Sequence, residues 1–191
     1  IDDIVDVVRE EATEDIQHIG GTEALDEPYL TGRFWSMVRK RAGWLAALFV
    51  GELFTATAMQ GYDEELRLAP VLMMFLPLII SSGGNSGSQA TTLVIRSLAL
   101  GEVKLRDWWR VIRRELASGF ALGALLAPIG VVRIFVWQAL GWADYTRYYG
   151  RVALSVGLSV IGIVMWGTIA GSMLPFILRK LGFDPARASA P

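Results

Sequence analysis

The chain has 191 residues, of which 53% are hydrophobic and 19% are charged, and its mean hydropathy of +0.42 lies above the usual globular balance. The net charge of −1 hides an asymmetry, because residues 1–27 carry ten acids against one arginine and the remainder carries 17 basic against 9 acidic residues. The absence of cysteine excludes disulfides and thiolate zinc sites, and a single histidine excludes multi-histidine metal centres and most triad hydrolases.

The first segment predicts an amphipathic helix over residues 2–19, since Val5, Val8, Ala12 and Ile16 recur at helical spacing and Gly20-Gly21 follows. Acids crowd its other side and repel one another at i,i+3 and i,i+4. A solvated helix face is the plainer interpretation. The alternative is a positive partner, either Mg²⁺ or Ca²⁺ held by carboxylate oxygens or the basic remainder of the chain. Residues 22–32 are typical of a linker.

The first long apolar stretch covers residues 42–62 and contains a single charge, Glu52. An ionisable group at membrane depth is a functional candidate. The alternative is a carboxyl group that is hydrogen-bonded between helices or lies near the membrane interface.

The second apolar stretch, residues 68–95, contains Pro70, Pro77 and the run GGNSGSQ. Prolines and clustered glycines weaken a helix, and freed carbonyls at membrane depth must be buried in protein or face water. Close helix packing is the alternative, and we expect it for the pairs Gly119/Gly123 and Gly167/Gly171. Because the small residues here are consecutive and include amides, we predict a pore or binding element lined by carbonyl and amide oxygens. Its residues are Gly83, Gly84, Asn85, Gly87 and Gln89.

Two further uncharged stretches cover residues 116–132 and 152–178. A bilayer core needs about 20 apolar residues of helix, so the shorter stretch spans it only by extending past Arg133 toward Trp142. The arginine must then face protein or reach the interface. The sequence therefore predicts an all-α membrane protein with four transmembrane helices behind a cytoplasmic amphipathic helix. No span offers paired acids or a nucleophile with its base, so an enzyme is not expected.

Basic residues orient these spans. Thirteen lysines and arginines lie before the first span, between the second and third, or after the fourth, and four lie on the opposite side. The positive-inside rule places the N-terminus, the 96–114 connection and residues 179–191 in the cytoplasm. The predicted location is multi-pass in the inner (plasma) membrane.

These features together resemble the MgtE family of bacterial magnesium channels and transporters. The matching pieces are residues 10–16, 77–103, 106–116 and 173–191, which follow the family's order. The resemblance implies a homodimer in the lipid membrane with five spans per chain and a pore on the dimer axis. It also implies Mg²⁺ as both transported and regulatory ion, and no nucleic-acid partner. Cytoplasmic N and CBS domains would precede a connecting plug helix.

By the same resemblance, residues 1–21 are expected to be the end of the plug helix. Its magnesium-linked acids would be Asp3, Asp6, Glu11, Glu14 and Asp15, with Asp184 near the cytoplasmic mouth. Residues 22–41 would form a linker and basic membrane-proximal segment, and residues 42–191 a pore domain. This chain departs from the family pattern because it lacks the N and CBS domains and stops before the expected fifth span, which carries the aspartate tied to ion selection. The alternative functions are a cation sensor or scaffold that does not transport, and a broader divalent-cation channel.

Overall fold

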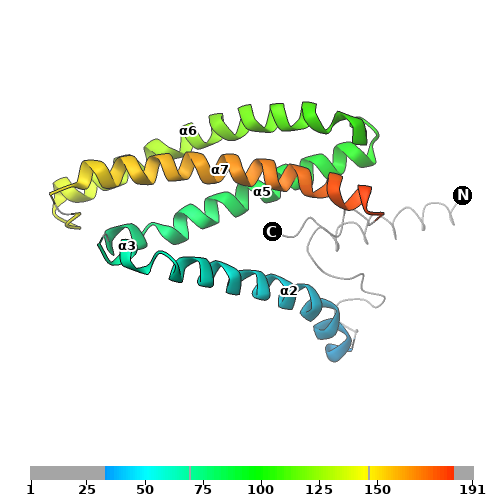
Figure 1. Ribbon diagram of the computed structural model, residues 1–191, viewed down its shortest axis with the longest axis horizontal. Coiled ribbons are helices and arrows are strands. Elements are labelled where there is room, and N and C mark those ends of the chain that lie inside the picture. Colours follow the sequence, from blue (N-terminus) through cyan, green and yellow to red (C-terminus); the bar gives the residue numbers. More distant parts are fainter. Residues whose placement is uncertain (1–32, 69, 146, 183–191) are drawn as a thin grey trace, which may run out of the picture. The chain divides into compact units, whose positions relative to one another are not determined.

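The computed structural model describes residues 33–68, 70–145 and 147–182. All regular elements in these ranges are helices, and four are long and apolar enough to cross a membrane, which confirms the predicted all-α class and its four spans (Figure 1). The acidic segment 1–21 and Asp184 lie outside the described residues. The chain divides into two compact units, one of which contains α2 while the other covers residues 64–177, and each is described by itself.

Helix α2 runs over Phe34–Gln60 and contains the first predicted span. It begins before residue 42, so the basic residues 39–41 belong to its second turn. Gly61 caps its C-terminal end, and the backbone N–H of this glycine donates to the carbonyl of Ala58 at 3.1 Å. None of its most apolar window is buried, and the side chain of Glu52 is exposed.

In the second unit, the short helices α3 (Asp63–Leu68) and α4 (Pro70–Met73) precede α5 (Leu76–Ala99). The chain leaves the helix at residues 74–75, and Pro77 then occupies the first turn of α5. At that position a missing backbone N–H costs nothing. The prolines thus coincide with a break, whereas residues 83–89 are helical throughout. Their carbonyls accept helical hydrogen bonds, and the expected loss of helix at the glycines does not occur.

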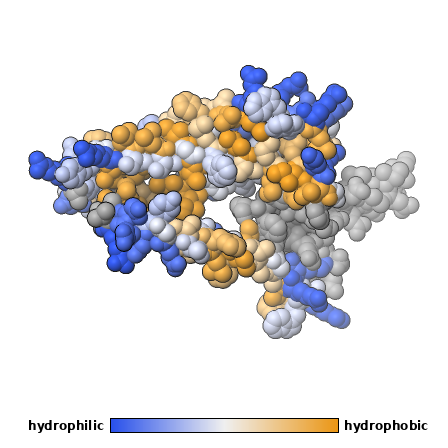
Figure 2. Space-filling view, viewed as in Figure 1, coloured by the Kyte–Doolittle hydropathy of each residue, from blue (hydrophilic) through white to orange (hydrophobic). Residues whose placement is uncertain are grey.

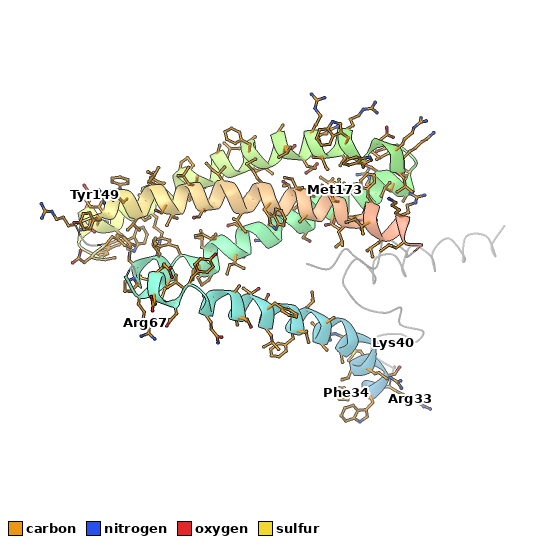
Figure 3. The ribbon with its side chains drawn as sticks, viewed as in Figure 1. Arg33, Phe34, Lys40, Arg67, Tyr149 and Met173 are labelled. Atoms are coloured by element: carbon orange, nitrogen blue, oxygen red, sulfur yellow. The ribbon has the colours of Figure 1, made fainter. Side chains whose placement is uncertain are left out.

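Helix α6 covers Trp108–Leu140 after the 3₁₀ turn η1 (Leu105–Asp107), and α7 covers Tyr149–Lys180. The 33 residues of α6 confirm that the third span extends past Arg133. Helices α5, α6 and α7 alternate in direction (Figure 1). Their buried hydrophobic side chains form two clusters, one toward each end of the three helices. Tyr149, labelled in Figure 3, begins α7, and Met173, also labelled, lies about two turns before its other end. One end of the core contains Phe75, Ile134, Tyr145 and Val152, and the other contains Val94, Leu98 and Phe176.

Arg133 faces protein and does not need to reach the membrane interface, which is the first of the two alternatives that the sequence predicted. Its Cζ atom lies 5.5 Å from the ring centroid of Phe75 and 5.0 Å from that of Trp137. Nearby, the backbone N–H of the buried Tyr145 donates to Gln138 Oε1 at 2.8 Å, which links the loop after α6 to the end of that helix. A guanidinium over aromatic faces is stabilised by the ring quadrupoles, so this charge is tolerated beside a buried core.

Replacing Arg133 with glutamine is expected to lower the free energy of unfolding by about 1 kcal/mol, because both cation–π contacts are lost. Thermal unfolding in detergent measures the change. Arg147→Gln, at an exposed arginine of the same unit, is the control and should leave the midpoint unchanged. Equal shifts in the two variants would show that the ring contacts do not stabilise the fold.

Candidate functional site

One face of α5 packs against α7 through glycine. A β-carbon added at Gly83 would lie 2.6 Å from Ile163 Cγ1, and one added at Gly87 would lie 3.1 Å from the carbonyl oxygen of Gly167. In the other direction, a β-carbon on Gly167 or Gly171 would overlap the backbone of Gly83 or Gly87. These four residues, here called the glycine contact, let the two helices approach at backbone distance.

Hydrogen bonds between α5 and α7 accompany the glycine contact. Thr91 Oγ1 lies 2.9 Å from the carbonyl oxygen of Gly87 and 2.8 Å from that of Gly171, so its hydroxyl links both helices. Ser86 Oγ donates to the carbonyl of Val164 at 3.5 Å. The buried hydroxyl groups on this face are therefore satisfied within the protein.

Helix α6 packs on α7 in the same manner. A β-carbon on Gly123 would lie 2.8 Å from Ile161 Cα, and one on Gly119 would overlap Thr168 Oγ1. Thr168 Oγ1 also lies 3.3 Å from the carbonyl oxygen of Glu115. The packing role predicted for Gly119/Gly123 and Gly167/Gly171 is confirmed.

One line of residues on the exposed side of α5 is polar. Ser81, Asn85, Ser88 and Thr92 are spaced by four, three and four residues, so they follow one line along the helix and are here called the polar stripe. Asn85 Nδ2 donates to Ser81 Oγ at 3.5 Å, and Thr92 Oγ1 donates to the carbonyl of Ser88 at 2.9 Å. Ser88 is half-buried and the other three residues are exposed.

The structure thus separates the five residues predicted to line a pore. Gly83 and Gly87 belong to the glycine contact, whereas Asn85 belongs to the polar stripe, and Gly84 and Gln89 are exposed beside it. Sequence reasoning missed the other three stripe residues, although their helical spacing was the available signal. The run of small and polar residues therefore has two faces, one for packing and one that presents oxygen atoms.

The polar stripe offers hydroxyl and amide oxygens without a formal charge. Such groups hydrogen-bond well to the water shell of a hard cation but bind a bare ion weakly. Uncharged oxygens of this kind are used where an ion must pass without being retained. The side-chain chemistry therefore fits passage of a hydrated cation better than tight binding.

Within residues 33–68, 70–145 and 147–182, no three histidine, cysteine or acidic side chains come together in a way that could hold a metal ion. The six acids predicted to bind magnesium all lie outside these ranges. Glu52 lies on α2, in the other compact unit. The polar stripe is therefore the candidate site that the described helices present.

Comparison with known proteins gives concordant matches. The family model MgtE, a divalent cation transporter, matches residues 76–191. The chain is 35% identical to the magnesium transporter MgtE of Thermus thermophilus over 191 residues, which are 100% of this chain and 40% of that protein. The proteins of the same name from Enterococcus faecalis and Bacillus subtilis are each 30% identical over the same shares. The chain thus spans about 40% of the length of the curated relatives it matches.

Proposed function

Because the chain belongs to the MgtE family of divalent cation transporters, we propose that its helices form part of a Mg²⁺-permeable pore in which the polar stripe faces the ion. The single observation that carries this proposal is the uncovered line of oxygen atoms on α5. From residue 81 to residue 92 the stripe extends about 16 Å at the helical rise. That length is roughly half the thickness of the hydrocarbon core.

Polar groups at that depth favour a water-filled path over contact with lipid tails. Mg²⁺ gives up its hydration water reluctantly, so hydroxyl and amide groups that hydrogen-bond to its water shell suit its passage. With the N-terminus on the cytoplasmic side of the inner membrane, the membrane potential drives the ion inward by about 2.3 kcal/mol per elementary charge per 100 mV.

The pore of this proposal lies between two copies of the chain. Helix α5 uses one face for the glycine contact with α7, which leaves the polar stripe free to oppose the same stripe of a second copy. A two-fold axis is the commonest symmetry of homo-oligomers and brings identical surfaces together. Gly84 and Gln89 would then flank the path, and Glu52 stays a candidate ion-binding group on α2.

The acidic segment 1–21 is the gate in this proposal. Asp3, Asp6, Glu11, Glu14 and Asp15 repel one another in a helix, and bound Mg²⁺ would neutralise that repulsion. The helix could then pack under the pore, with Asp184 near the cytoplasmic mouth. Loss of Mg²⁺ would favour the open arrangement by population shift. Cytoplasmic N and CBS domains of the full-length protein would act on this segment.

Flux measurements on the full-length protein in proteoliposomes test the function. Mg²⁺ uptake that depends on the protein is the expected result, whereas a sensor or scaffold would give none. Competition by Ca²⁺ and Mn²⁺ separates a magnesium-selective pore from a broader divalent-cation channel. Protein-dependent uptake without competition supports magnesium selectivity.

The quintuple variant D3N/D6N/E11Q/E14Q/D15N is expected to lose inhibition by Mg²⁺ on the cytoplasmic side. A coupling of at least about five-fold between bound Mg²⁺ and flux should disappear, because the neutral segment has no carboxylates left to bind the cation. The matched control is E64Q/E65Q on α3, which should keep the inhibition. A quintuple variant that is inhibited like the unmodified protein would refute the gate.

A further inference from the structure

The beginning of α6 carries a concentrated positive surface that ion passage does not use. Arg110, Arg113 and Arg114 are three and four residues apart on the helix, and Arg106 precedes them in η1. These four exposed residues, here called the arginine patch, surround an open hollow of about 540 Å³ together with Asp107 and Trp109. Figure 2 shows hydrophilic groups gathered at this end of α6, next to the hydrophobic surface of the helix.

The arginine patch is poorly neutralised by the protein. Two acids lie beside its four arginines. The carboxylate Oδ1 of Asp107 lies 3.2 Å from a guanidinium nitrogen of Arg110, and Glu115 interacts electrostatically with Arg114. Neither Arg106 nor Arg113 makes an ion pair with any residue that the structure describes. Like charges at helical spacings of three and four residues repel, so an external anion would stabilise this turn.

The residues around the patch are of the kind expected where a span meets the lipid headgroups. Trp108 and Trp109 are 49% and 56% exposed and stack edge to face at 5.7 Å between ring centroids. The uncharged part of the span begins at residue 116, just beyond the patch. Tryptophan is enriched at the membrane–water interface, and long arginine side chains extend toward the headgroups there.

We propose that the arginine patch binds the headgroup phosphate of an anionic phospholipid. Planar guanidinium groups bind phosphate oxygens in pairs, and arginine supplies four of the five basic residues between 104 and 114. Basic clusters where a transmembrane helix meets a negatively charged leaflet attract such lipids. Trp109 would pack along the glycerol region of the bound lipid. The proposal needs only that α6 spans the membrane, so it is independent of ion passage.

Native mass spectrometry of the full-length protein, released from detergent with equal amounts of phosphatidylglycerol and phosphatidylcholine, tests the proposal. The unmodified protein is expected to retain phosphatidylglycerol at least five-fold more often than phosphatidylcholine. The double variant R106Q/R113Q should lose this preference. R147Q/R151Q removes the same charge beyond the other end of α6, at two exposed arginines, and should keep it.

A second pair of measurements separates a headgroup site from diffuse charge attraction. R106K/R113K keeps the charge but loses the planar donors, and it should retain less phosphatidylglycerol than the unmodified protein. Retention equal to that of the unmodified protein would overturn the proposal. Unchanged retention in R106Q/R113Q would overturn it as well. A response to Mg²⁺ lost in that same variant would then identify the acidic segment 1–21 as the occupant of the patch.

Discussion

Replacing Gly171 with alanine is expected to lower the free energy of unfolding by about 2 to 3 kcal/mol, the upper range for overpacking a close contact. The new methyl group would overlap the backbone of Gly87, and backbone cannot move aside as a flexible side chain can. Separating α5 from α7 would also stretch the hydrogen bond from Thr91 Oγ1 to the carbonyl of Gly171. Thermal unfolding in detergent, with the yield of monodisperse protein, measures the loss.

Gly162→Ala is the matched control on the same helix. No atom lies within 4 Å of a β-carbon at Gly162, so the methyl group meets open space. Alanine is the better helix former, by up to about 1 kcal/mol. The control should therefore be neutral or slightly more stable. If the two variants unfolded at the same temperature, the glycine contact would not be what holds α5 against α7.

Replacing Asn85 with leucine is expected to reduce Mg²⁺ flux into proteoliposomes at least ten-fold while leaving the unfolding midpoint unchanged. Asn85 lies in the middle of the polar stripe and makes one long hydrogen bond, to Ser81, so the fold loses little. A leucine there removes the amide and places a hydrophobic side chain in the path, which favours local dewetting.

Two variants of the same helix serve as controls for that experiment. Asn85→Ser keeps an uncharged side-chain oxygen at the position and should continue to conduct. Leu93→Ala changes a 60% exposed side chain outside the polar stripe and should conduct like the unmodified protein. Unchanged flux through Asn85→Leu would refute the assignment of the polar stripe to the pore, whatever the flux of the controls.

The four spans were predictable because length without charge is a sufficient signal in a bilayer, where no water satisfies the backbone. The third span needed one further argument, that Arg133 must face protein or reach the interface, and the rings of Phe75 and Trp137 show that it faces protein. The packing of Gly119 and Gly123 was also predictable from the sequence. Their four-residue spacing places two small residues on one face of a helix, which lets another helix approach closely.

The behaviour of residues 83–89 was not predictable from local propensity. Glycine costs about 1 kcal/mol in a helix relative to alanine, which suggested an interrupted backbone. The compensation comes from α7, some 80 residues away along the chain, where Gly167 and Gly171 complete the contact. A break occurs instead at residues 74–75, which places Pro77 in the first turn of α5, where its missing N–H costs nothing. Which polar residues remain uncovered depends on that distant partner.

The glycine contact has a consequence for how the polar stripe can be altered. Because backbone lies against backbone, α5 cannot turn about its own axis without a clash, and the hydroxyl of Thr91 further restrains its sliding along α7. The orientation of Asn85 is therefore fixed by residues on the opposite side of the helix. Substitutions along positions 81, 85, 88 and 92 can be interpreted as changes in side-chain chemistry at constant geometry. Any enlargement at positions 83, 87, 167 or 171 would instead push α5 away from α7 and displace all four of those side chains together.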